Sequence, residues 1–299
     1  MHAPTAAGYT AEEPTHPPPW HGLVVWDLFF NALTTGLFMT AAVGELAAPS
    51  VFGPVTKWAY PLALVLLLTD LTFLVLDLGD PLRFHHMLRV FKPSSPMSLG
   101  TWCLTTYSFP LAVVVVIGLA VLVGLVPGDS ATLGWVHRGL LVFALPFAFG
   151  SMAYKGVLFS TSSQPGWRDA RWLGAYHVAS GFALGSAILL ALAALTGSEL
   201  ATTALRPAVM ALLVVQMVPL VFLVRELLPA LAQRRRREQM RGAAALVFGV
   251  GGLVPLVLLP FGGAVVDVVV AATALVGGWV VRHWVVMLPR FSLSGATAH

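Results

Sequence analysis

The sequence predicts an all-α integral membrane protein, a bundle of eight transmembrane helices. Of its 299 residues, 58% are hydrophobic and only 10% are charged, whereas soluble domains carry about 25% charged residues. The apolar residues fall into eight runs, each long enough to cross a hydrocarbon core about 30 Å thick. Because backbone groups in lipid must bond internally, and the runs do not alternate in polarity like barrel strands, we expect helices.

The expected helices follow one another along nearly the whole chain. Their ranges are 22–48, 58–78, 100–125, 134–159, 172–195, 206–229, 242–261 and 264–288. Only Gly262 and Gly263 separate the last two, and such a pair favours a turn. Residues 1–21 are rich in Pro and lack Lys and Arg, so we expect a disordered or partner-docking arm followed by an uncleaved first helix. Residues 22–288 then form one membrane domain, and 289–299 a C-terminal tail.

Basic residues are distributed unequally between the two sides of the membrane. The side on which odd-numbered helices start and even-numbered helices end is called face A, and the opposite side face B. Face A receives 14 of the 17 basic residues, including the run 234–237, and face B only Lys57, Arg138 and Arg206. The positive-inside rule predicts that face A is cytoplasmic. Alternatively, face A lies outside the cytoplasm, and an acidic partner holds its Arg-rich loops there.

Polar residues inside the expected helices also gather toward face A. They come from six helices: Asp27, Asn31, Asp77, Tyr154, His177, Glu226 and Arg282. Ionisable residues in a membrane span are costly and mark substrate or proton paths. We therefore predict a polar pocket that opens to face A. The competing interpretation is that each residue lies at the interface and reaches toward the head groups.

Three carboxylates are expected deeper in the membrane or toward face B. Asp70 falls near the middle of the second expected helix, while Glu45 and Asp267 lie toward face B. A chain through Asp77, Asp70 and Glu45 would carry protons between the faces. Alternatively, Asp70 is a protonated carboxyl bonded to a neighbouring helix.

The residue types near face A suit a quinone head group. Its carbonyls need donors or acceptors, and its reduction couples electrons to protons, which Tyr, His and carboxylates exchange. Asn31, Asp77, Tyr154 and His177 are candidates. The single cysteine, Cys103, excludes an iron–sulfur cluster held by this chain, and no pair of histidines at matching depth suits haem. No metal site is predicted, and nothing points to nucleic acid.

Two segments resemble the NrfD-type family, the membrane subunits of polysulfide reductase and related complexes. Residues 77–84 read Asp-Leu-Gly-Asp-Pro-Leu-Arg-Phe, and residues 95–102 read Ser-Pro-Met-Ser-Leu-Gly-Thr-Trp. Residues 154–160, Tyr-Lys-Gly-Val-Leu-Phe-Ser, are similar to a second motif of that family. The resemblance covers residues 22–288. Asp80 stands where the family often has Arg.

The resemblance implies a haem-free membrane subunit of a respiratory oxidoreductase in a bacterial or archaeal cytoplasmic membrane. Such a subunit exchanges electrons between menaquinone or ubiquinone and a ferredoxin-like iron–sulfur subunit, which serves a molybdopterin or other catalytic subunit. It implies that Asp77 forms the quinol site or its proton exit and that Tyr154 bonds the quinone. Asp70 is a further catalytic candidate, from its expected depth in the membrane and not from the resemblance. We expect Arg83, Arg89 and Lys92 to form the docking surface.

Two other functions are considered beside this one. The first is a proton-coupled secondary transporter with Asp70 and Asp267 as proton sites, although the two halves of the chain show no clear repeat of the kind such transporters often have. The second is a structural membrane anchor of a redox complex, without quinone chemistry.

Overall fold

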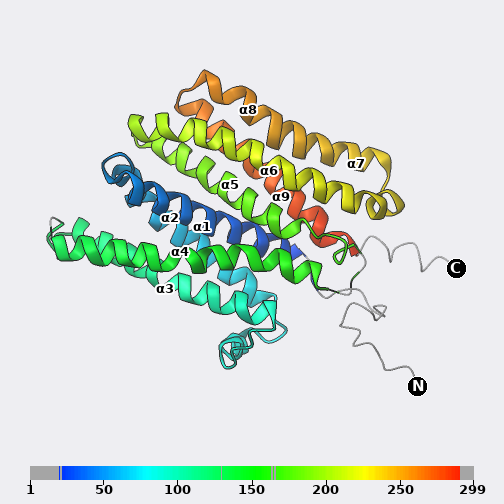
Figure 1. The fold of residues 1–299 in the computed structure, drawn as a ribbon, viewed down its shortest axis with the longest axis horizontal. Helices are drawn as coiled ribbons and strands as arrows, with labels where there is room; N and C mark the ends of the chain where they lie inside the picture. The colour runs from blue at the N-terminus through cyan, green and yellow to red at the C-terminus, as the bar shows by residue number, and fades with distance from the viewer. Residues whose placement is uncertain (1–19, 21, 129, 163, 165, 290–299) are drawn as a thin grey trace.

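The computed structural model describes residues 20, 22–128, 130–162, 164 and 166–289. Eight helices in this part of the chain are long and apolar enough to cross a membrane, which confirms the predicted fold class (Figure 1). The first six spans are α1 Gly22–Ala47, α2 Pro49–Leu76, α3 Pro96–Leu122, α4 Ala131–Ser160, α5 Leu173–Leu195 and α6 Glu199–Arg234. The seventh combines α7 Arg237–Ala244, η3 Ala245–Leu253, α8 Val254–Leu258 and η4 Leu259–Phe261, and α9 Ala264–Met287 is the eighth. The arm and the tail, apart from Trp20 and Pro289, lie outside the described residues.

The second helix begins well before its predicted start. It begins at Pro49 rather than residue 58, because proline at the first helical position lacks only an N–H group that would have no partner there. Its interior prolines, Pro54 and Pro61, do not end it. The expectation that Asp70 lies mid-helix is therefore wrong. Asp70 is six residues before the helix end at Leu76, in the part of α2 nearer face A.

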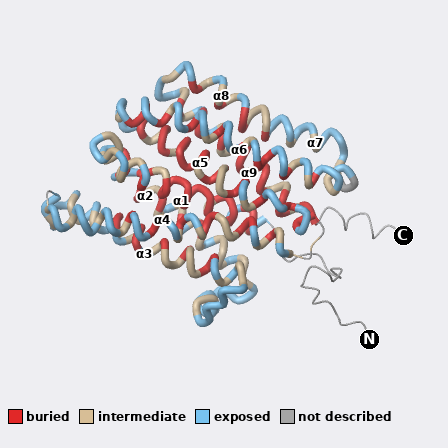
Figure 2. Tube along the Cα trace, viewed as in Figure 1, coloured by how far each residue is buried: buried red, intermediate tan, exposed pale blue. Residues whose placement is uncertain are grey.

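Helices α1 and α5 form the centre of the bundle, and each has more buried residues than any other helix of the described chain (Figure 2). They cross at Gly36, Gly181 and Gly185, where a Cβ on Gly36 would overlap the Gly181 backbone and one on Gly185 the Gly36 backbone. Small residues let membrane helices approach closely, and packing rather than hydrophobicity holds them together in lipid. The contact therefore fixes the polar residues of α1 relative to those of α5.

The seventh span is irregular. Its middle part, η3, is a nine-residue π-helix, a conformation that is rare beyond single bulges. Gly251 of η3 packs against Gly277 of α9 so closely that a Cβ would meet backbone, as expected from the small residues there. The predicted turn between the last two spans is confirmed, since Gly262 and Gly263 both have positive φ, which glycine adopts without steric cost.

Face A carries the long connection between α2 and α3. It includes the 3₁₀ helix η2 (Pro81–Leu88), in which no residue is buried. Figure 1 shows this connection at the same end of the bundle as the link between α6 and α7 and the end of α9. The polar groups described next lie toward this end.

Candidate functional site

Two carboxylates and one ammonium group form a cluster inside the bundle. The Nζ atom of Lys155 lies 2.7 Å from Asp27 Oδ1 and 3.5 Å from Asp70 Oδ1. Asp70 exposes 0% of its surface, Lys155 2% and Asp27 6%. Buried charges are costly unless they are paired and hydrogen-bonded. The helices α1, α2 and α4 therefore meet at an ion-paired group in which two carboxylates share one cation.

Asn31 holds the second oxygen of Asp70. Its Nδ2 group donates to Asp70 Oδ2 at 3.1 Å and to Ser151 Oγ at 3.2 Å. Asn31 and Asp27 are four residues apart on α1, and Ser151 and Lys155 are four apart on α4, so each pair shares one helix face. Asp70 is thus fixed by an ammonium on one oxygen and an amide on the other.

A second buried cation, Arg282 of α9, approaches the same turn of α1. Its Nε donates to the Leu28 carbonyl at 3.2 Å, while Lys155 Nζ donates to the Asp27 carbonyl at 3.2 Å. Arg282 also donates to Ser180 Oγ at 3.0 Å and lies over the ring of Tyr176. Two cations from different helices therefore bind adjacent carbonyls of α1. Counted together, Asp27, Asp70, Lys155 and Arg282 balance in formal charge.

The two sequence motifs meet beside this cluster. Gly100 of α3 packs against Tyr154 of α4, and a Cβ at position 100 would overlap the Tyr154 ring. Tyr154 directly precedes Lys155 in the sequence. Its hydroxyl has no hydrogen-bond partner within the described residues. The buried indole N–H of Trp102, from the same motif as Gly100, likewise has no partner in the described part of the chain. Lys155 Nζ lies 5.9 Å from the centre of the Tyr154 ring, so one of these two free donors belongs to a side chain next to the charged cluster.

His177 of α5 is a further buried polar group without a complete set of partners. It is 2% exposed, and its Nε2 atom has no hydrogen-bond partner among the described residues. The Tyr176 ring lies beside it, with centroids 6.3 Å apart. The imidazole can therefore accept or donate a hydrogen bond to a ligand that enters the bundle.

Asp77 is half-buried and lies at the end of α2, where its N–H donates to the Phe73 carbonyl at 3.0 Å. The adjoining connection is exposed, including all three predicted docking residues, Arg83, Arg89 and Lys92. Arg83 Nε pairs with Asp80 Oδ2 at 3.0 Å. Asp80, the departure from the family motif, is therefore compensated within the connection itself.

Glu226 lies at another helix junction. Its Oε2 accepts from the Trp172 backbone N–H at 3.1 Å, and so ties α6 to the start of α5. A carboxylate is favourable at the N-terminus of a helix. None of its described hydrogen bonds or ion pairs reaches the cluster around Lys155, so its assignment to the quinone site stays a prediction.

Face B carries two separate polar groups. Glu45 pairs with His137 Nε2 at 3.0 Å and accepts from the Tyr60 hydroxyl at 2.6 Å. Asp267, a proton site in the transporter hypothesis, instead accepts two bonds from Arg206, at 3.1 and 2.9 Å. Such bidentate pairs fix the geometry of both partners.

One face of α1 connects the two ends of the bundle. The residues on it are Asp27, Asn31, Thr34, Phe38 and Glu45, spaced by four, three, four and seven positions as one helix face requires. Thr34 Oγ1 lies 2.8 Å from the Tyr107 hydroxyl. Beyond it the Phe38 side chain is fully buried, with its ring 5.1 Å from the Tyr107 ring and 6.0 Å from the Tyr60 ring. No described hydrogen bond joins Thr34 or Tyr107 to Glu45, and Phe38 lies between them on this face.

The sequence places Lys155 among the polar groups toward face A, but the interpretation gave it no role at the site and did not single out Ser151 or Ser180. The available signal was a lysine within an apolar span, four residues after a serine. Among the described residues no group of three or more His, Cys, Asp or Glu side chains could hold a metal ion.

A family model described as polysulphide reductase, NrfD, matches residues 11–292. The comparison with curated proteins finds no match. The match to the family model covers all eight spans and both motifs.

Proposed function

The chain belongs to the NrfD family, membrane subunits of polysulphide reductase and related complexes, and from this premise we propose that it exchanges electrons between menaquinone or ubiquinone and an iron–sulfur partner. It does so as one subunit of an oxidoreductase complex and is not catalytic alone. The observation that carries the proposal is the unpartnered Tyr154 hydroxyl beside the buried ion pairs of Lys155.

The quinone head group would bind between donors that have no other partner. The Tyr154 hydroxyl would donate to one carbonyl, and its ring position is fixed by Gly100. His177, with its free Nε2 atom, is the candidate for a second hydrogen bond. Asp77 would lie at the rim toward face A, and Arg282 would contribute positive charge behind the site.

The carboxylates are suited to hold protons. Oxidation of a quinol releases two protons and two electrons, and reduction takes up the same number. Because Asp27 and Asp70 share one ammonium, the group can accept a proton without leaving Lys155 unpaired. We assign Asp70 to this proton-holding role and Asp77 to exchange with face A, while the electrons pass to or from the partner.

The exposed connection between α2 and α3 is the proposed docking surface for a ferredoxin-like subunit. It presents three basic side chains, and also apolar ones such as Leu82 and Val90, which are 85% and 68% exposed. Exposed apolar patches rimmed by charge are typical of protein interfaces. A molybdopterin or other catalytic subunit would bind beyond it, in a complex of a bacterial or archaeal cytoplasmic membrane.

The test is quinone binding to the purified complex that contains this chain. We expect Tyr154→Phe to weaken the binding of a quinone analogue about fivefold, since one hydrogen bond contributes about 1 kcal/mol. Tyr60→Phe, which removes a hydroxyl at face B, is the matched control and should bind normally. If both variants bind the analogue equally and Asp77→Asn leaves quinol turnover unchanged, the remaining hypothesis is that the chain is only a structural anchor of the complex.

A further inference from the structure

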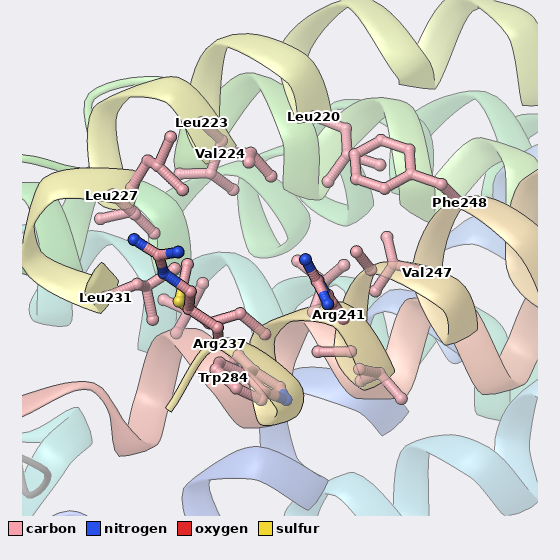
Figure 3. A pocket seen from close by; sticks show the side chains of 17 residues that line it. Leu220, Leu223, Val224, Leu227, Leu231, Arg237, Arg241, Val247, Phe248 and Trp284 are labelled. Carbon is pink, nitrogen blue, oxygen red and sulfur yellow. The ribbon is translucent and has the colours of Figure 1, made fainter. Parts of the chain in front are cut away.

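An apolar pocket of about 370 Å³ lies between α6, the α7–η3 segment and α9 (Figure 3). Its walls include Leu220, Leu227, Val247, Phe248 and Trp284. Its volume is within the range of about 300–1,000 Å³ found for ligand pockets. None of its lining residues belongs to the cluster around Lys155, so this pocket is separate from the proposed quinone site.

Two guanidinium groups enter this apolar pocket. Arg237 and Arg241 are four residues apart on α7 and thus share one face, and Figure 3 shows both among the apolar side chains, between those of α6 and Trp284. Neither has a hydrogen-bond or ion-pair partner within the described part of the chain. No lining residue is acidic. The pocket therefore offers two uncompensated positive charges above an apolar slot.

The position of the pocket relative to the membrane matches this polarity. The two arginines lie where the chain enters the seventh span from face A, and Trp284 lies near the face A end of α9. The Arg235 guanidinium is 5.5 Å from the Trp284 ring, and tryptophan and arginine are typical of the membrane–water boundary. The slot itself continues inward to Val247 and Phe248, in the π-helix η3.

We propose that this pocket binds one anionic phospholipid. The two guanidinium groups would bind its phosphate, as Arg does in bidentate geometry, and the apolar slot would take an acyl chain. A zwitterionic headgroup fits less well, because the lining offers no carboxylate to its ammonium. A quinone fits less well too, because its head group carries no charge to match two cations. The lipid would fill the space between α6 and α7. No residue of α7 is buried.

The proposal is tested by native mass spectrometry of the delipidated full-length protein. Phosphatidylglycerol, phosphatidylcholine with the same acyl chains, and glycerol phosphate are titrated separately. We expect the first to bind at least tenfold more tightly than the other two. Arg237→Gln combined with Arg241→Gln should weaken phosphatidylglycerol binding about 30-fold, from a factor of about five for each basic side chain.

Two further variants separate the pocket from general surface charge. Arg236→Gln removes an exposed arginine of the same run that does not line the pocket, and should bind phosphatidylglycerol normally. Val247→Trp fills the slot without changing charge and should abolish tight binding. Equal affinity for both phospholipids, glycerol phosphate binding as tightly as the lipid, or displacement of the lipid by a quinone analogue would each overturn the proposal.

Discussion

Replacing Lys155 with methionine would remove the only cation that the two buried carboxylates share by ion pairing in the described structure. Methionine keeps an unbranched apolar stem in the space of the lysine side chain. Asp27 and Asp70 would remain, exposed by 6% and 0%, with no ammonium between them. The expected result is a large loss of stability, not a local change at the surface.

The magnitude follows from the distances. With an effective dielectric constant of about 20, unit charges at 2.7 and 3.5 Å attract each other by about 6 and 5 kcal/mol before desolvation is subtracted. Breaking a buried pair by removing one partner costs about 3–5 kcal/mol. For a protein of this size about 1 kcal/mol lowers Tm by roughly 2–4 °C, so Lys155→Met should lower Tm by roughly 6–20 °C.

The assay is thermal unfolding of the purified protein in detergent, followed by intrinsic fluorescence. Lys57→Met, which removes an exposed lysine near face B, is the control and should change Tm by less than about 2 °C. Asp27→Asn alone should be tolerated, because Lys155 keeps Asp70 as its partner. Adding Asp27→Asn to Lys155→Met should recover part of the loss. A Tm for Lys155→Met equal to that of the control would refute the assigned charge arrangement.

Two other variants test the neighbouring features. Gly100→Ala should displace the Tyr154 ring and weaken the binding of a quinone analogue by about fivefold, as loss of the hydroxyl does, whereas Gly118→Ala, whose Cβ would meet nothing within 4 Å, should bind normally; equal binding by the two would show that the contact does not position the hydroxyl. Because proton exchange is assigned to Asp77 at face A, Glu45→Gln, which weakens the group at face B, should leave both analogue binding and proton release or uptake unchanged, measured with a pH-sensitive dye on proteoliposomes of the complex. Reduced proton movement at face B in this variant would show instead that protons cross the bundle through Glu45.

Hydropathy was sufficient to predict the eight spans because lipid leaves the backbone few alternatives. Helix ends were less predictable. Pro54 and Lys57 made the start of α2 look like a connection, yet the helix begins at Pro49. That difference of nine residues moved Asp70 from the expected membrane centre to the level of Asp27, where it meets Lys155.

The site was predictable as a set of polar residues near one face, but not as a set of partners. Asp27, Asn31 and Asp70 come together as bonded neighbours. The partnership of Lys155 and Arg282 with adjacent carbonyls of α1 depends on how three helices pack, which no local pattern determines. The regular spacing along α1 from Asp27 to Glu45 was a usable signal, since those positions share one helix face.

The aromatic layer at Phe38 has an electrical consequence. Polar groups reach inward from face A as far as Tyr107 and from face B as far as Tyr60, and polar groups screen a field better than hydrocarbon does. On α1, Glu45 lies eleven residues beyond Thr34, about 16 Å at 1.5 Å per residue, and Phe38 lies between them. A unit charge crossing the whole voltage changes in energy by about 2.3 kcal/mol per 100 mV. We therefore expect a proton that passes from Asp70 beyond Phe38 to Glu45 to do more work against the voltage than one that reaches Asp70 from face A.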